Sequence, residues 1–206
     1  MNRIFIEAKN KRTPEYFFLK TIIGQFFPGK EVDFVCIDGI GNLFNETNVN
    51  QMIQAQTIGE QVIVLADADY VAKGTGYVQR DGDMKKGMAN HLLSFPYLLY
   101  PNNHDDGVVE VLMEAAARRD LHAVFFDCFE DYENCVSGVK DASGKPIYNT
   151  PNLKGKLHTY MTAHQLSSRL RNGLGTGDWL FHDISYWNLN VAELQPLKDF
   201  LAVNLK

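Results

Sequence analysis

Carboxylates follow two apolar, strand-like segments of this chain. Glu7 comes directly after Ile4–Ile6, and Asp67 and Asp69 follow the run Val62–Ala66. In an open parallel α/β sheet, the carboxyl ends of the strands and the loops after them line the ligand crevice. Carboxylates crowded at one such edge repel each other unless a cation shares them, and Mg²⁺ or Mn²⁺ is the hard divalent ion that oxygen ligands favour. The sequence therefore predicts a divalent-cation site at this edge.

The spacing of Asp67 and Asp69 fits this interpretation, because residues two apart point to the same side of an extended backbone. The alternative is that both side chains only cap or hydrogen-bond the loop that follows. A second Asp-x-Asp sequence, Asp81-Gly82-Asp83, is predicted to be an exposed turn.

A third acidic group, Asp105, Asp106 and Glu110, follows the predicted fourth strand. Asp106 either completes the cation site or caps a helix predicted at Gly107–Arg119. Glu110 lies one turn into that helix and is a second candidate to face the same crevice. The sequence leaves open which of the three acids joins the site.

Basic residues flank both acidic segments. They are either a rim that binds phosphate groups or an ordinary solvated surface, which is the commoner role of exposed lysines. The set comprises Lys9, Lys11 and Arg12 after Glu7, and Lys73, Arg80, Lys85 and Lys86 after the Asp-x-Asp pair.

Strands and helices alternate over the first half of the chain, which predicts a parallel sheet with right-handed crossovers. The expected strands are Ile4–Ile6, Val32–Ile37, Val62–Ala66 and Phe95–Tyr100. Thr13-Pro14 starts a helix that ends before Pro28-Gly29, with Thr13 as the N-cap. Further helices are expected at Thr47–Ile58, Met84–Leu93, Gly107–Arg119, Val124–Val136, Leu153–Gln165 and Val191–Leu205. A long loop is expected at Tyr70–Asp83 and a turn-rich connection at Lys140–Pro151, and Gly173–Asp178 is either a flexible loop or a close-approach turn.

The composition is that of a globular protein. The chain has 206 residues, of which 45% are apolar and 22% charged, enough for one large domain or one domain with an appended segment. A formal net charge of −5 argues against a non-specific nucleic-acid coat. No segment predicts a membrane span or a signal peptide. An odd number of cysteines without a CxxC pair fits a reducing cytoplasm and no zinc site.

The acidic motifs together resemble the TOPRIM domain of topoisomerases, bacterial primases, OLD-family nucleases and recombination-mediator proteins. The chain is most similar to stand-alone bacterial TOPRIM-like proteins of uncharacterised function. The matching segments are Glu7-Ala8, Asp67-Ala68-Asp69 and Pro101-Asn102…Asp106-Gly107…Glu110. The resemblance implies a Rossmann-like α/β core with four mainly parallel strands flanked by helices at residues 1–115. Residues 116–206 would form a helical C-terminal extension packed on the same domain.

For function, the resemblance implies that Asp67 and Asp69 hold Mg²⁺ or Mn²⁺ with the help of Asp106 or Glu110. Glu7 either acts as general acid/base at a phosphodiester or completes the metal site, and Lys9 is the second candidate catalytic residue. The expected activity is metal-dependent nicking or hydrolysis of nucleic acid, or phosphotransfer, in DNA repair or phage defence.

Other functions remain open. One alternative is a non-catalytic regulatory protein that binds nucleic acid, a nucleotide or a protein, and a third is a nucleotide-binding protein of receiver type. The chain has no P-loop sequence. An ATPase would therefore be a separate partner, alongside nucleic acid or a second copy of the chain.

Overall fold

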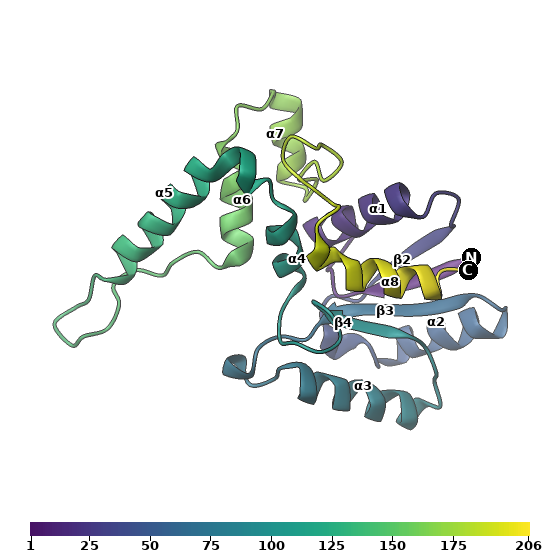
Figure 1. Ribbon diagram of the computed structural model, residues 1–206. Helices are drawn as coiled ribbons and strands as arrows, with labels where there is room; N and C mark the ends of the chain where they lie inside the picture. Colours follow the sequence, from purple (N-terminus) through teal and green to yellow (C-terminus); the bar gives the residue numbers. More distant parts are fainter.

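The computed structural model describes residues 1–206 and contains a four-stranded, all-parallel sheet (Figure 1). The strands are β1 (Asn2–Ile6), β2 (Val32–Cys36), β3 (Gln61–Asp67) and β4 (Tyr97–Tyr100), in the order β2-β1-β3-β4. The predicted α/β fold with a parallel sheet is confirmed. The two central strands, β1 and β3, are the ones whose apolar runs lead to Glu7 and Asp67.

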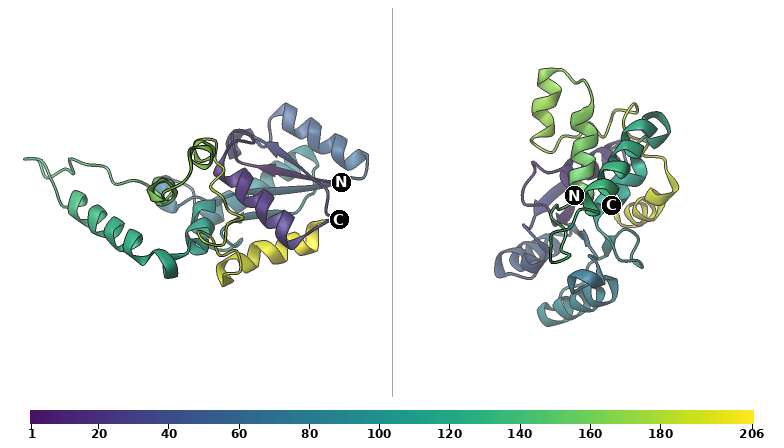
Figure 2. Two further views of the ribbon diagram at one scale, coloured as in Figure 1. Left: turned by 90° about the horizontal axis from the view of Figure 1, so that it is seen from above. Right: turned by 90° about the vertical axis from the view of Figure 1, so that its left-hand side faces the viewer.

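Helices cover both faces of the sheet, as expected for strands that are apolar on both sides. Helices α1 (Pro14–Phe26) and α8 (Gln195–Asn204) lie on one face, and α2 (Glu46–Thr57) and α3 (Tyr77–His91) lie on the other (Figures 1 and 2). Each face has its own buried apolar cluster. The cluster under α1 contains side chains from Ile4 to Leu205, so both ends of the chain contribute to it.

The start of α1 follows the predicted capping. The Thr13 hydroxyl oxygen accepts a hydrogen bond from the Tyr16 N–H at 3.4 Å, and Pro14 occupies the first helical position. This cap fixes the N-terminus of α1, and with it the next residue, Glu15, near the carboxyl edge of the sheet.

The predicted loop Tyr70–Asp83 is wrong in its second half. Helix α3 begins at Tyr77 and includes the sequence Asp81-Gly82-Asp83, which is therefore not a turn. The local sequence carries no start signal, because the N-cap residue is Gly76 and no neighbouring side chain caps the helix. Asp106 supplies the cap instead, since its Oδ1 accepts a hydrogen bond from the Tyr77 N–H at 2.7 Å.

The helix expected at Gly107–Arg119 is shorter than predicted. Helix α4 spans Val109–Ala116, and α5 (Arg119–Ser137) begins a few residues later, ahead of the predicted Val124. The alternative in which Asp106 caps α4 is therefore wrong, because its carboxylate bonds to Tyr77 and Val71 instead. The capping group of α4 comes from β3 and is described below.

The remaining helices project from the sheet domain. Helices α5 and α6 (Leu153–Ala163) form an arm joined by an exposed loop, and α7 (Ser168–Leu174), which was not predicted, follows them (Figures 1 and 2). Short 3₁₀ turns lie at Ile40–Asn42, Val71–Lys73 and Ala192–Leu194, so α8 starts later than the predicted Val191. None of the helices combines the length and apolar character required to cross a bilayer.

Candidate functional site

Glu7 and Asp67 lie together at the carboxyl edge of the sheet. Their strands are neighbours, with Ile6 paired to Leu65. The Glu7 carboxylate accepts hydrogen bonds from two backbone amides, with Oε2 3.3 Å from the Asp67 N and Oε1 3.2 Å from the Ile40 N. Burial raises the pKa of Glu7, these two amides lower it, and the nearby charge of Asp69 raises it again, with a net upward shift.

Asp67 joins the sheet to α4. Its Oδ1 accepts a hydrogen bond from the Val109 N–H at 2.8 Å, the first amide of that helix, where the N-cap residue Val108 has no side-chain oxygen to offer. Burial raises the pKa of Asp67 well above its usual range, and the charges of Glu7 and Glu110 add to the rise. Asp67 therefore lies where negative charge is crowded and poorly hydrated.

Asp69 forms an ion pair with Arg80, which the sequence analysis left as part of either a phosphate-binding rim or a solvated surface. The Arg80 guanidinium, on α3, lies 2.5 Å from Asp69 Oδ2, and both side chains are largely buried. The Asp69 backbone also pairs with Gly107 in a short antiparallel bridge. Asp69 thus ties the loop after β3 to both α3 and the segment before α4.

Asp106 and Glu110 have separate partners. Asp106 uses both carboxylate oxygens to accept backbone hydrogen bonds, from Tyr77 and from Val71 at 3.1 Å. Glu110, whose side chain is 12% exposed, lies 3.4 Å from the Lys154 ammonium. The side chains of Asp67 and Glu110 interact electrostatically, whereas Asp106 holds the start of α3.

Two residues at this edge were missed by the sequence analysis. Glu15 is buried, its Oε1 has no hydrogen-bond partner, and burial followed by the charges of Asp67, Glu7 and Glu110 raises its pKa well above the usual range. The Tyr100 hydroxyl is also buried without a partner, and its pKa is raised by burial and then by Glu15. A glutamate in the first turn of a helix usually interacts favourably with the helix dipole at the surface, so the sequence carried no signal that Glu15 is buried.

The lysines after Glu7 lie outside this group. Lys9 is exposed and makes no hydrogen bond or ion pair, and Lys11 pairs with Asp33 on β2 at 3.1 Å. The structure therefore does not bring the candidate catalytic residue Lys9 into contact with Glu7, Asp67 or Asp69.

The carboxylates supply the oxygen ligands that a hard divalent cation takes. Hydrogen bonds leave Asp67 Oδ2 and Asp69 Oδ1 without a donor, whereas Arg80 pairs with Asp69 and Lys154 with Glu110. No three His, Cys, Asp or Glu side chains form a group that could hold a metal ion as they stand. The donor chemistry thus fits Mg²⁺ or Mn²⁺, but binding would require the side chains to move.

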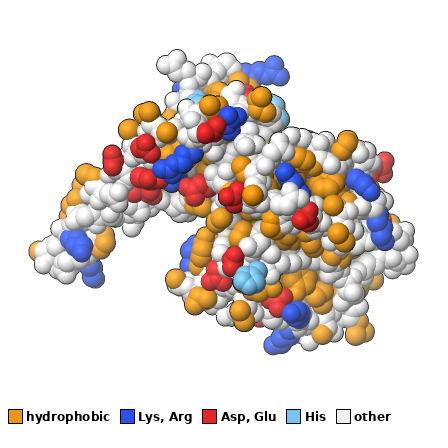
Figure 3. Space-filling model, in the orientation of Figure 1, with side chains coloured by type: hydrophobic (Ala, Val, Ile, Leu, Met, Phe, Trp, Pro, Cys, Tyr) orange, Lys and Arg blue, Asp and Glu red, His pale blue; other side chains and the backbone are white.

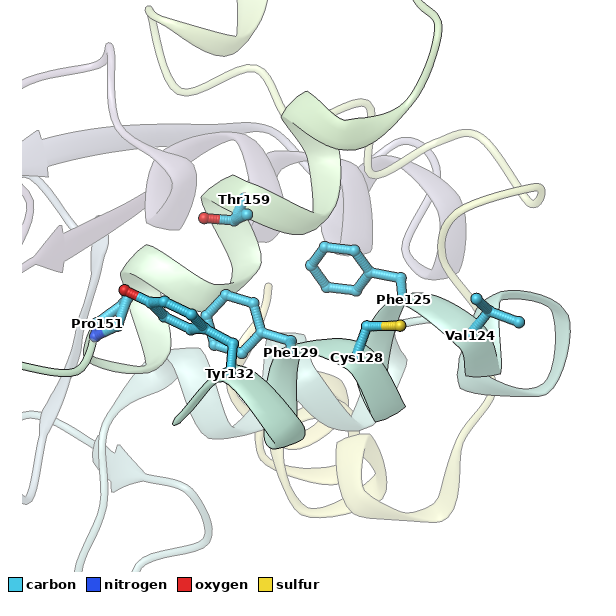
Figure 4. Close-up of a pocket in the computed structure, with 7 residues that line it drawn as sticks. All are labelled: Val124, Phe125, Cys128, Phe129, Tyr132, Pro151 and Thr159. Carbon is cyan, nitrogen blue, oxygen red and sulfur yellow. The ribbon is translucent and has the colours of Figure 1, made fainter. Parts of the chain in front are cut away.

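Two of the cavities on the helical side of the molecule are larger than the others there. One, of about 500 Å³, is an apolar groove between α5 and α6 (Figure 4). It contains none of the clustered carboxylates, although acidic side chains stand along the arm beside it (Figure 3). The other, of about 510 Å³, is polar and lies between the N-termini of α1 and α6. The apolar groove is lined by Val124, Phe125, Cys128, Phe129, Tyr132, Pro151 and Thr159.

Comparisons of the chain with protein-family models, with curated proteins and with solved structures give no match.

Proposed function

We propose that this chain is a TOPRIM-like protein that binds Mg²⁺ or Mn²⁺ at the carboxyl edge of its sheet and cleaves nucleic-acid phosphodiesters there. The observation that carries the proposal is the gathering of Glu7, Glu15, Asp67 and Glu110 in a poorly hydrated region, where burial and mutual repulsion raise the pKa values of three of them. Such an arrangement is costly for the fold unless something offsets it, and perturbed carboxylates cluster at functional sites.

Glu7, Asp67 and Asp69 are the proposed cation ligands, with Glu110 beside them. A cation at this edge would neutralise charge on phosphoryl oxygens and activate a water molecule for attack. Asp67 and Asp69 each have one oxygen free of hydrogen bonds, whereas Asp106 has none and keeps its capping role. In the alternative role for Glu7, as general acid/base instead of ligand, its raised pKa lets it hold a proton more readily than an exposed glutamate does.

A specific observation also favours the non-catalytic alternative. Glu7, Asp67 and Asp106 all accept hydrogen bonds from backbone amides, and Asp69 is paired with Arg80. The same carboxylates would then serve the scaffold, and the protein would recognise nucleic acid, a nucleotide or a protein without turnover.

A cleavage assay separates these two functions. The wild type, Asp67→Asn and a control variant, Asp83→Asn, are incubated with supercoiled plasmid and with single-stranded DNA and RNA, in Mg²⁺, Mn²⁺ or EDTA. Asp83 is an exposed residue of α3 and makes no hydrogen bond through its side chain. Metal-dependent cleavage that Asp67→Asn abolishes and Asp83→Asn retains supports the enzyme. Binding of a substrate without cleavage by the wild type supports the alternative.

A further inference from the structure

The polar cavity between α1 and α6 is basic, in contrast to the carboxylate cluster beside it. Arg12, Lys154 and His158 line it, and none of its lining residues is acidic. The protein as a whole carries a formal net charge of −5, so this local excess of basic groups runs against the overall balance. A concave, basic surface on an acidic protein indicates an anionic ligand.

Two helix N-termini meet at this cavity. Thr13 and Pro14 open the 13-residue helix α1, and Asn152 caps the 11-residue helix α6; all three line the cavity. Pro14 has no N–H, and the amides of Tyr16 and Gly155 donate to the caps Thr13 and Asn152, so these ends act through the partial positive charge that the helix dipole places there. Together these ends favour a phosphate-like anion.

The opposite wall holds a buried donor without an acceptor. Trp179 lines the cavity, is 2% exposed, and its indole N–H makes no hydrogen bond. An indole nitrogen is only a donor, so the residue in this wall carries a hydrogen-bond donor that no group of the protein uses. By contrast, the other tryptophan, Trp187, donates its indole N–H to the Trp179 carbonyl oxygen at 2.7 Å.

The wall that carries Trp179 is held tightly against the start of α1. Gly177 has φ +85°, and a Cβ atom there would lie 2.5 Å from the Thr13 carbonyl carbon. Only glycine combines this conformation with this close approach. The segment Leu174–Trp179 is therefore fixed across the N-terminus of α1, which gives the cavity a preformed shape.

The basic cavity and the acidic cluster share a border. Lys154 lines the cavity and pairs with Glu110, and Pro14 lines the cavity while the next residue, Glu15, belongs to the acidic cluster. We propose that the cavity lined by Arg12, Lys154 and Trp179 binds a phosphoryl group of the substrate next to the cation site. The inference that a phosphoryl group binds depends only on the residues of the cavity. The inference that this group belongs to a nucleic-acid backbone rests on the proposed function.

Arg12→Gln is the direct test of phosphoryl binding. The Arg12 side chain makes no ion pair, so its replacement removes a ligand contact without breaking a contact of the fold. Inorganic phosphate is titrated in EDTA, with the two indole N–H signals followed by NMR. We expect a saturable shift of the Trp179 signal, and a dissociation constant that Arg12→Gln raises roughly tenfold or more, as for loss of a charge-assisted hydrogen bond. Lys154→Gln should weaken binding in the same direction.

The matched control is Arg169→Gln, which removes an exposed arginine of α7 that does not line the cavity. The proposal is overturned if phosphate produces no saturable shift at Trp179, or if Arg12→Gln and Arg169→Gln weaken binding equally, which would indicate only general attraction of anions.

A second titration identifies the source of the phosphoryl group and uses a short single-stranded oligothymidylate in EDTA. Displacement of inorganic phosphate by the oligonucleotide supports a nucleic-acid backbone as the ligand. Phosphate binding that the oligonucleotide leaves unchanged overturns that assignment. Because neither titration contains a metal ion, a failure of cation binding or cleavage would leave both results intact.

Discussion

Nearly every carboxylate at the edge of the sheet has a structural partner. Asp67 caps α4 and Asp106 caps α3. Asp69 pairs with Arg80, and Glu7 accepts two amide hydrogen bonds. Glu15 is the exception, since one of its oxygens is buried without any partner. At the residue scale, the clearest consequences of this arrangement concern Asp106 and Glu15.

Replacing Asp106 with alanine should destabilise the protein by about 1–3 kcal/mol, because the amides of Val71 and Tyr77 lose their acceptor. Urea denaturation of Asp106→Ala measures the loss, and Asp105→Ala, at an exposed neighbouring position, is the control. Equal stability of the two variants would mean that the Asp106 carboxylate, as cap of α3, contributes nothing to the free energy of unfolding.

Replacing Glu15 with glutamine should change how stability depends on pH. The folded protein holds the Glu15 proton at a pKa well above the usual value, so it binds more protons than the unfolded chain between the two pKa values. The free energy of unfolding therefore falls as pH rises through that window. Glutamine mimics the protonated carboxyl at every pH, so Glu15→Gln should gain stability relative to the wild type as pH rises above the usual pKa of a glutamate.

Urea denaturation in EDTA from pH 5 to pH 8 measures the difference between Glu15→Gln and the wild type, in which the contributions of groups that do not interact with Glu15 cancel. A difference that stays constant with pH would show that Glu15 is ionised in the folded protein.

At the scale of elements, the strands were the most predictable part of the molecule. Apolar runs of β-branched and aliphatic residues define β1, β2 and β3 to within a residue or two, and Thr13-Pro14 marks the start of α1. The start of α3 was missed because its cap comes from Asp106, far along the chain, while Gly76 gives no local signal. Local patterns predict elements only where local groups also stabilise them.

The same limit applies to the candidate site. The sequence placed Glu7, Asp67 and Asp69 at strand ends, and the structure has them there. The ion pair with Arg80 and the buried Glu15 depend on how α3 and α1 pack against the sheet, which no short-range spacing reveals.

Two glycines of α3 should respond to alanine in opposite directions. A Cβ atom at Gly87 would lie 2.2 Å from a ring carbon of Phe44, whereas nothing lies within 4 Å of one at Gly82. Gly82→Ala should stabilise the protein by roughly 0.5–1 kcal/mol through better helix propensity. Gly87→Ala should destabilise it by roughly 1–2 kcal/mol through overpacking. Thermal unfolding of the two variants tests this, and stabilisation by both would show that Phe44 moves aside without cost.

For the whole molecule, the two chain ends are joined beside the sheet. The Asn2 side chain is fully buried, donates from Nδ2 to the carbonyl oxygens of Glu31 and Lys206, and accepts from the Lys206 N–H at 2.8 Å. These contacts hold the end of α8 against β1. The apolar cluster beside them includes Ile4 from β1 and Leu201 from α8.

Asn2→Ala should therefore cost about 2–4 kcal/mol of stability, because the three hydrogen bonds of this side chain are lost. Urea denaturation measures this, with Asn190→Ala, at an exposed position, as the control. If Asn2→Ala were no more destabilising than the control, the C-terminal segment would not be held by this contact.

The central claim is that the acidic edge of the sheet binds a divalent cation, and calorimetric titration of the metal-free protein with Mn²⁺ tests it most directly. Asparagine at position 67 keeps an oxygen to accept from Val109 but loses the negative charge, so Asp67→Asn isolates cation binding from helix capping. We predict saturable binding by the wild type and by Asp83→Asn, weakened roughly tenfold or more in Asp67→Asn. No binding by the wild type, or equal binding by Asp67→Asn, would contradict the claim.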